Sequence, residues 1–382
     1  MVKPPQMPTV TNARTSNGSD QRVASPPKAE ITKEPSTLMN NVPHGNPPGT
    51  RPPNHNATPY LNTPPVAAPH ATASQFHIAI NAWVSSLLIM TKPLIALFFA
   101  AAFTCSAQTV AQLYGEKTLA NIAGVDRTID GVLGVAAIDL TTGETLEYHA
   151  RTESATASLI KVPLLVQLMR ARREGAFGMD DKLTLQSSDA VTGSGHLQEE
   201  LAQGPVTLTV HDLIVRMIVD SDNTATNRLI ALAGMEQVNA TMQSLGLAHT
   251  RLQRVMMDSA AARTDRENVS TPADIAHLLA LIWRGEAAAP DYCREILSIM
   301  KHVNGAFRAT ITDDVEVASK TGEVGGVYTE GGIVLLKNRP FAFAVMTSLL
   351  PDAVNPIPAV AAVLYRHFER LGHGNLYGNE VH

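Results

Sequence analysis

Prolines are concentrated at the beginning of this 382-residue chain, where 15 of the 24 lie in the first 70 residues. Runs such as "GNPPGTRPPN" and "NTPPVAAPH" place mainly small and polar residues between the prolines. Such a composition cannot bury enough apolar surface to fold, so residues 1–89 are predicted to be disordered or polyproline-like. A packed globular domain is therefore expected only in the rest of the chain.

An apolar segment follows the proline-rich stretch. Residues 90–107 combine a methionine, one lysine, an apolar run and a final "CSA", which is typical of a secretory signal peptide. Because signal peptides begin chains, Met90 is expected to be the true start and residues 1–89 an over-extended reading. A membrane anchor over residues 78–107 is disfavoured, since Lys92 would lie in mid-bilayer at a cost of about 2.5–3.5 kcal/mol. Export is therefore expected, with no stable membrane span after cleavage.

Composition narrows the class of protein further. The net charge is −5 and no basic stripe stands out, which disfavours nucleic acid as a partner. The two cysteines, Cys105 and Cys293, cannot form a disulfide framework. The histidines are scattered singly, without the close spacing of zinc ligands, so no metal is expected.

The globular part, residues 108–382, begins with a predicted β-hairpin over residues 132–149, where apolar residues alternate around a Thr-Gly turn. A helix follows, and Pro163 is tolerable only if that helix begins near Ser158, because proline is harmless only in a first turn. Ser158 then lies at a helix N-terminus with Lys161 one turn away on the same face.

This pair has chemical meaning. A serine hydroxyl becomes a nucleophile when a base takes its proton, and a desolvated lysine of lowered pKa can do so. The backbone N–H groups of a helix N-terminus can also stabilise an oxyanion that forms beside Ser158. Taken alone, S-x-x-K is a weak motif, because a capped and solvated helix accounts for it equally well.

Two further motifs strengthen the prediction. An apolar helix over residues 209–234 has a threonine cap and is interrupted by Ser221-Asp222-Asn223, which indicates a functional loop on a rigid scaffold or a surface turn. Residues 313–350 alternate as strands with a hairpin around "KNRP", and Lys320-Thr321-Gly322 is predicted to end the first of these strands.

In this order, S-x-x-K, S-D-N and K-T-G resemble the signature set of class A β-lactamases and penicillin-binding proteins. The intervals of 63 and 99 residues between the three motifs are similar to those of class A enzymes. The resemblance covers nearly all of residues 108–382, up to a closing helix over residues 358–372. It implies an α+β fold, in which helices flank an antiparallel five-stranded sheet and an all-helical lobe is inserted.

The resemblance also implies roles for the motif residues. Ser158 would be the acylated nucleophile, Lys161 its proton acceptor, and Ser221 the group that passes a proton to the leaving nitrogen. The substrate would be a small β-lactam or a cell-wall peptide, with no metal or organic cofactor. A monomer in the periplasm or outside the cell is expected.

The substrate-binding roles follow in the same way. Asn223 would hold the substrate amide, and Lys320 and Thr321 its carboxylate. Gly322 lets the backbone approach a ligand closely. The backbone N–H of Glu323 would complete the oxyanion hole with that of Ser158, so the Glu323 side chain need not matter.

One family feature is missing from the sequence. Class A β-lactamases carry a loop glutamate that activates the deacylating water, in a stretch of the form R-x-E-x-E-L-N. Here "RVMMDS" occupies residues 254–259. Counting from Arg254 places the glutamate at Met256, and counting from Ser221 places it nearer Met257. Neither side chain can take a proton from water, and Asp258 corresponds to the second acid of the family stretch.

Three interpretations remain open. Asp258, or a displaced carboxylate such as Glu267, replaces the missing base; or acylation proceeds with slow deacylation, as in a penicillin-binding or sensor protein; or the enzyme is a D-alanyl peptidase that needs no such glutamate. Loss of a positioned base costs about 10²–10⁴-fold in rate. The strand after K-T-G also lacks the arginine that supports the lysine in many class A enzymes, and whether Arg308 approaches instead is left open.

Overall fold

The computed structural model describes residues 108–351, 354–375 and 377–380. The predicted proline-rich segment (residues 1–89) and the predicted signal peptide (90–107) lie outside the described residues. Among the described residues, no helix is both long enough and apolar enough to span a bilayer.

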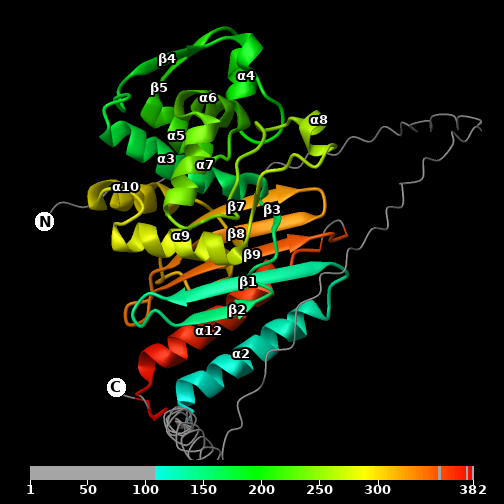
Figure 1. The fold of residues 1–382 in the computed structure, drawn as a ribbon, viewed down its shortest axis with the longest axis vertical. Helices are drawn as coiled ribbons and strands as arrows, with labels where there is room; N and C mark the ends of the chain where they lie inside the picture. Colours follow the sequence, from blue (N-terminus) through cyan, green and yellow to red (C-terminus); the bar gives the residue numbers. More distant parts are fainter. Residues whose placement is uncertain (1–107, 352–353, 376, 381–382) are drawn as a thin grey trace, which may run out of the picture. The chain divides into compact units, whose positions relative to one another are not determined.

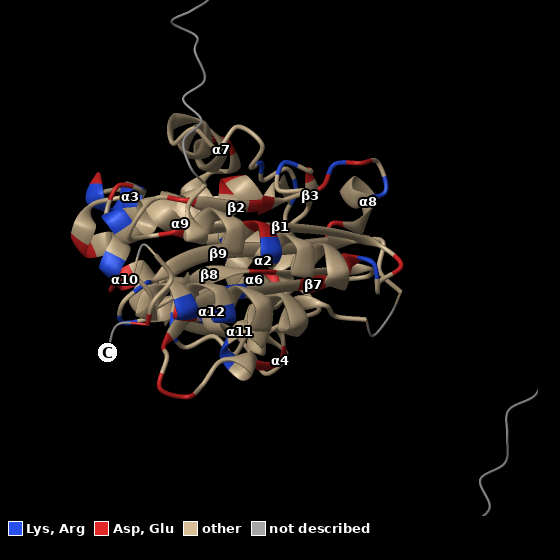
Figure 2. Cartoon of the chain, turned by 90° about the horizontal axis from the view of Figure 1, so that it is seen from below, with Lys and Arg blue, Asp and Glu red and all other residues tan. Residues whose placement is uncertain are grey.

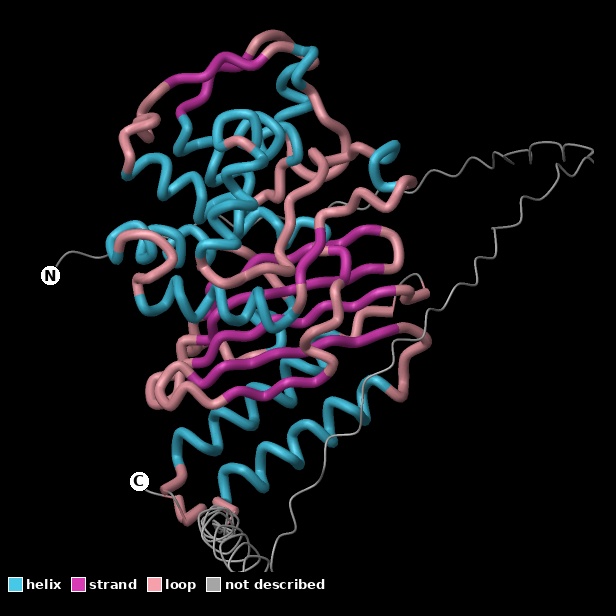
Figure 3. The backbone as a smooth tube through the Cα atoms, viewed as in Figure 1, coloured by secondary structure: helices cyan, strands magenta, loops and turns pink. Residues whose placement is uncertain are grey.

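A five-stranded antiparallel sheet forms the centre of the described domain, with the strand order β2-β1-β9-β8-β7 (Figure 3). The strands are β1 (Val132–Asp139), β2 (Thr145–Tyr148), β7 (Val317–Val324), β8 (Val327–Val334) and β9 (Phe341–Ser348). The predicted hairpin over residues 132–149 is confirmed as β1–β2, and the predicted hairpin around "KNRP" joins β8 to β9. Since β1 pairs along its whole length with β9, the two ends of the domain sequence meet in one sheet.

Helices cover both faces of this sheet (Figure 1). The first and last described helices, α2 (Val110–Asp126) and α12 (Ile357–His373), pack against each other on one face, together with the short α11 (Ala306–Thr310). Stacked aromatic rings fill this layer, with the centroids of Phe307 and Phe343 3.5 Å apart. Helix α9 (Pro272–Arg284) packs on the other face, against β1, β8 and β9.

An all-helical lobe is inserted between β2 and β7. Its helices are η1 (Ala157–Ile160), α3 (Lys161–Arg173), η2 (Ser187–Asp189), α4 (Leu197–Leu201), α5 (Val210–Val219), α6 (Asn223–Ala233), α7 (Met235–Ser244), α8 (Ser259–Ala262) and α10 (Pro290–Met300). Two small ribbons pair β3 (Ser154–Ala155) with β6 (Val269–Ser270), and β4 (Lys182–Leu185) with β5 (Val206–Thr209). Helix α3 is buried along most of its length, and each large apolar side chain buried there contributes about 1.5–3 kcal/mol.

The α+β architecture predicted from the resemblance is therefore confirmed.

Charged side chains also link elements within the lobe. Figure 2 shows residues of both charges in the neighbourhood of α3 and α10. Arg172 of α3 donates to Glu295 of α10 at 2.7 Å, and its guanidinium lies 4.9 Å from the ring centroid of Tyr292. With the side chains of Arg172 and Glu295 about 30% exposed, this pair stabilises the contact of α3 and α10 by ~1 kcal/mol or less.

Candidate active site

Ser158 lies in the 3-10 helix η1, which leads directly into α3. The sequence places the start of the helix near Ser158, and the structure places one 3-10 turn there before the α-helix begins at Lys161. Pro163 is the third residue of α3, within its first turn, as predicted. Ser158 therefore lies at the N-terminal end of a long buried helix, where backbone N–H groups are free to face a ligand.

The turn before Ser158 is held in a strained conformation. Ala157 has a φ of +46°, a left-handed conformation that costs an L-residue of order 1 kcal/mol. Hydrogen bonds on both sides of the domain hold the preceding residue: Thr156 O accepts from Thr329 Oγ1 of β8 at 2.9 Å, and Thr156 N donates to Asn268 O at 2.9 Å. The sheet and the loop before β6 thus fix the position of Ser158 together.

Lys161 is completely buried and makes three polar contacts. Its Nζ donates to Ser221 O at 2.6 Å, to Ser221 Oγ at 3.0 Å and to Asn223 Oδ1 at 3.1 Å. Burial, reinforced by the positive charge of Lys320, holds the pKa of Lys161 well below its ordinary value, while Asp222 opposes the shift. Such an amine can be neutral at physiological pH and accept a proton from a nearby hydroxyl.

The Ser221-Asp222-Asn223 triplet joins α5 to α6, as predicted from the interrupted apolar helix. Ser221 has a φ of +55°, and the strained backbone directs its carbonyl and hydroxyl oxygens toward Lys161. Asp222 caps α6, accepting from Ala225 N at 2.8 Å, and also accepts from Leu197 N at 2.9 Å. The middle residue therefore holds the loop, and its neighbours face the site.

Lys320 reaches the same serine from the sheet. Its Nζ donates to Ser221 Oγ at 3.2 Å and to Thr321 O at 2.9 Å, and only 1% of its surface is exposed. Burial lowers the pKa of Lys320 to about 8, against the negative charge of Glu330. The structure thus brings the three predicted motifs together around the hydroxyl of Ser221.

Gly322 allows β7 to approach Ser158 closely. A Cβ at this position would lie 2.7 Å from Thr156 O and 2.8 Å from Ser158 N, closer than real side chains approach. The predicted strand end is wrong in one detail, because β7 continues past Lys320-Thr321-Gly322 to Val324 through its pairing with β8. Glu323 is therefore still within the strand, with an exposed side chain.

The loop over residues 251–268 is closed by an ion pair and an amide. Arg254 donates to both carboxylate oxygens of Glu267, at 2.9 and 3.0 Å, and the two side chains are 12% and 24% exposed. Asn268 Oδ1 accepts from the backbone N–H groups of Gln253 and Arg254. Since the ion pair engages both oxygens of Glu267, this carboxylate is poorly suited to replace the missing base.

Asn227 is a residue that the sequence analysis missed. Its side chain clamps the main chain of Met256, with Oδ1 accepting from Met256 N at 2.7 Å and Nδ2 donating to Met256 O at 3.2 Å. Asn227 follows Asn223 by one turn of α6, so the clamp places Met256 near the residue that contacts Lys161. An asparagine four residues after S-D-N is the signal that could have indicated it.

Met256, Met257 and Asp258, where the resemblance places the loop glutamate, differ in environment. The Met256 side chain is 8% exposed and belongs to the core of the lobe, whereas Met257 is 54% exposed and has a φ of +64°. Asp258 caps α8, with Oδ1 accepting from Ala261 N at 2.9 Å. The cap uses one carboxylate oxygen, so a role for Asp258 as substitute base remains a prediction.

Arg308 does not contact the side chain of Lys320. Its guanidinium donates to three backbone carbonyls, those of Lys301, Val303 and Val317, and so connects α11 to the beginning of β7.

Within the described residues, no group of three or more His, Cys, Asp or Glu side chains is arranged to hold a metal ion.

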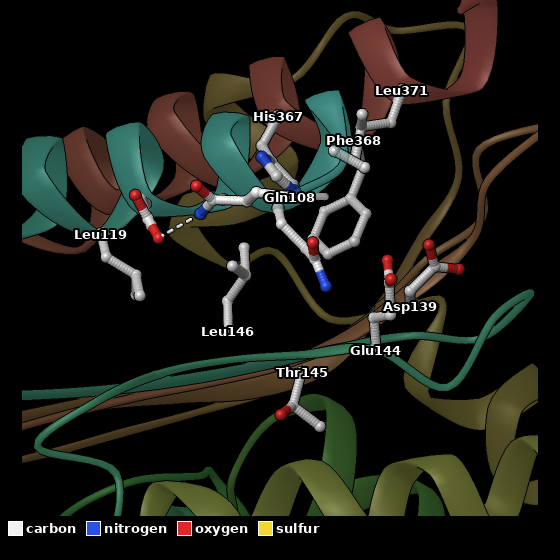
Figure 4. Close-up of a pocket in the computed structure, with 13 residues that line it drawn as sticks. Gln108, Leu119, Asp139, Glu144, Thr145, Leu146, His367, Phe368 and Leu371 are labelled. Carbon is white, nitrogen blue, oxygen red and sulfur yellow. Dashed lines mark hydrogen bonds between the residues drawn. The ribbon is translucent and has the colours of Figure 1, made fainter. Parts of the chain in front are cut away.

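A cavity of about 570 Å³ lies on the other face of the sheet, between α2, α12 and the β1–β2 hairpin (Figure 4). None of its lining residues belongs to the three motifs. His367 lines it and is 4% exposed; its Nδ1 lies 2.8 Å from Thr118 Oγ1, which itself donates to Tyr114 O. The imidazole therefore donates through Nδ1–H, and burial lowers its pKa to about 4. This histidine is a structural one.

The buried histidine predicts acid sensitivity. Because the pKa of His367 is about 4 in the folded protein and near 6.5 in the unfolded chain, the unfolded state binds more protons between these values. The free energy of unfolding should therefore fall by up to about 3 kcal/mol as the pH drops through this window. Urea denaturation at several pH values should show a flatter dependence for His367→Gln, while His302→Gln, at an exposed site, should match the native protein. Equal pH dependence in all three proteins would contradict this.

The chain is similar in sequence and fold to known proteins. Residues 116–368 match the model of the β-lactamase enzyme family. A β-lactamase of Streptomyces lavendulae is 31% identical over 249 residues, which cover 61% of this chain and 80% of the relative.

Solved structures agree in fold. The crystal structure of a β-lactamase from Sphaerobacter thermophilus is 28% identical with a TM-score of 0.61, over 67% of this chain and 97% of that one. A glutamate-for-leucine mutant of a protein called PBP-A, solved as an acyl-enzyme complex with penicillin G, is 26% identical with a TM-score of 0.60, over 67% and 96%.

Proposed function

Since this chain belongs to the β-lactamase enzyme family, we propose that it is an exported serine hydrolase that opens the β-lactam amide through an acyl-enzyme on Ser158, with slow release of the acyl group. The observation that carries the proposal is the buried Lys161, one turn from Ser158 and in contact with Ser221 and Asn223. Because the pKa of Lys161 is lowered, its amine can be neutral and accept a proton, whereas an ordinary solvated lysine stays protonated.

The proposed acylation conserves protons throughout. Ser158 Oγ attacks the lactam carbonyl carbon and its proton passes to Lys161. The N–H groups of Ser158 and Glu323 donate to the oxygen of the tetrahedral intermediate. When the C–N bond breaks, the leaving nitrogen takes a proton from the hydroxyl of Ser221, which Lys161 replaces through their contact of 3.0 Å.

Substrate binding would use the remaining motif residues. Asn223 would hold the substrate amide, while Lys320 and Thr321 would bind its carboxylate beside Ser221. The contact of Lys320 with Ser221 at 3.2 Å supports this, because it places a cation beside the hydroxyl that serves the leaving nitrogen. The Gly322 backbone would line the approach to the acylated serine.

The proposal of slow deacylation is based on the loop over residues 251–268. Met256 and Met257 cannot activate water, Glu267 is engaged by Arg254, and Asp258 caps α8. Residues 90–107 as signal peptide and residues 108–382 as a monomeric hydrolase domain complete the proposal.

The test combines turnover with intact mass. The purified protein is mixed with a chromogenic cephalosporin. We expect one rapid equivalent of product and a covalent adduct on Ser158 that is released only slowly. Ser158→Ala should form no adduct and show no turnover above background. Fast turnover without a persistent adduct would contradict slow deacylation. If neither adduct nor turnover appears, the β-lactam proposal fails and D-alanyl peptides become the substrates to examine.

A further inference from the structure

Glu330 is a completely buried carboxylate that no part of the proposed mechanism uses. It lies on β8 directly opposite Thr321 of β7, next to the pair formed by Lys320 and Gly331. A buried carboxylate is costly unless it is hydrogen-bonded or paired with a charge, so its presence beside the carboxylate-binding strand calls for an account.

Three hydrogen bonds hold this carboxylate. Ser319 Oγ donates to Oε1 at 2.8 Å, and the backbone N–H of Phe307 donates to Oε2 at 3.2 Å, with a further backbone hydrogen bond from Ala306. Because a backbone N–H can only donate, the contacts with Phe307 and Ala306 suit the ionised form of the carboxyl group. Ser319 is the residue before Lys320, so the carboxylate also fixes the backbone that carries the lysine.

The chain is shaped to admit Glu330 here. A Cβ at Gly305 would lie 2.0 Å from Glu330 Oε1 and 3.0 Å from Ser319 Oγ, so any side chain at residue 305 would displace the carboxylate. The guanidinium of Arg308, three residues later, donates to the carbonyls of Lys301, Val303 and Val317. It is therefore not a hydrogen-bond partner of Glu330.

We propose that Glu330 is a positioning residue for carboxylate recognition: from behind β7 it supplies the negative charge and the anchoring that let Lys320 bind the carboxylate of the substrate. The proposal rests on the function proposed above, in which Lys320 makes that contact. In this role Glu330 would support Lys320 in place of an arginine, which the strand after K-T-G lacks.

The charges around the two lysines support this role. Lys161 and Lys320 are both buried and meet at Ser221, and the positive charge of Lys320 helps to lower the pKa of Lys161. Asp222 favours the charged form of Lys161, and Glu330 favours that of Lys320. Burial raises the pKa of Glu330 itself, while its donors and Lys320 oppose that shift. Each carboxylate therefore opposes the loss of a proton from a different lysine, and the one that acts on Lys320 is Glu330.

The decisive variant is Glu330→Gln, which keeps the shape and most hydrogen bonds but removes the charge. The titration of Lys320 is followed in the full chain through its ¹³Cε NMR signal, assigned with Lys320→Arg. Native Lys320 should titrate near pH 8, and the variant about 1 pH unit lower. Glu330→Asp should restore part of the shift. Glu316→Gln, at an exposed carboxylate just before β7 that pairs with Lys301, should leave the titration unchanged.

A second readout separates charge from structure. With a β-lactam that carries a carboxylate, Glu330→Gln should raise the concentration for half-maximal acylation about fivefold at pH 8, because the charged fraction of Lys320 falls there from about one half to about one tenth, and leave the limiting rate nearly unchanged. An unshifted Lys320 titration in Glu330→Gln overturns the proposal, and so does a fall in the limiting rate alone. Because the NMR titration needs no substrate, it decides the role of Glu330 even if the native protein forms no adduct.

Discussion

Replacing Lys161 by methionine is expected to slow the acylation of Ser158 by about 10²–10⁴-fold, the usual contribution of a positioned proton acceptor. Methionine has a similar length and fits a fully buried site, but it cannot accept the proton of a serine hydroxyl. Stopped-flow acylation by a chromogenic cephalosporin gives the limiting rate and the half-saturating concentration separately. We expect Lys161→Met to lower the limiting rate.

The pH dependence gives this prediction a direction. Because the pKa of Lys161 lies well below its ordinary value, the native enzyme should lose activity on the acid side as Lys161 becomes protonated. In Lys161→Met this acid limb should disappear from the residual rate. The matched control is Lys182→Met, at an exposed position of β4, which should acylate at the native rate. Native acylation by a folded Lys161→Met protein, checked by circular dichroism, would exclude Lys161 as the proton acceptor.

The placement of Lys161 could be predicted because local rules determine it. A proline allowed only in a first turn locates the helix start, and the three-residue spacing then puts Ser158 and Lys161 on one face. The same applies to Ser221-Asp222-Asn223, where a polar triplet interrupts an apolar helix that has a capping threonine. These patterns involve residues close together in sequence, so the sequence contains the information.

Glu330 and Arg308 could not be predicted in this way. In a strand that alternates, Glu330 reads as an ordinary polar residue, and its burial depends on α11, which packs against the sheet from 20 or more residues earlier in the chain. Arg308 could have pointed toward Lys320, but three carbonyls brought together by α11 and β7 bind its guanidinium instead. Tertiary contacts of this kind decide where a long side chain points, and periodicity says nothing about them.

Asn227 lies between these two cases. Its spacing from Asn223 indicates a shared helix face, but its partner, Met256, is 29 residues away and is brought to it by the folding of the loop. That loop in turn depends on the Arg254–Glu267 ion pair and on Asn268. The ambiguity between Met256 and Met257 therefore came from counting along a loop whose geometry long-range contacts determine.

Met256→Glu is expected to release the acyl group from Ser158 about 10²–10⁴-fold faster than the native protein. The clamp by Asn227 holds the main chain of residue 256 one helical turn from Asn223, and Asn223 contacts Lys161. A glutamate there would be largely buried, so burial should raise its pKa, while a protonated Lys161 nearby would favour its ionised form. The carboxylate would then supply the base that the native loop lacks.

The measurement is the lifetime of the Ser158 adduct, followed by intact mass after excess β-lactam is removed. Met257→Glu is the matched control, because it adds the same group at the next residue, whose side chain is 54% exposed and whose backbone Asn227 does not hold. We expect it to leave the lifetime nearly native. Asp258→Asn should also do so, because that carboxylate caps α8; a longer-lived adduct in this variant would identify Asp258 as the native base. If Met257→Glu shortens the lifetime and Met256→Glu does not, residue 257 is the one that faces the acyl group.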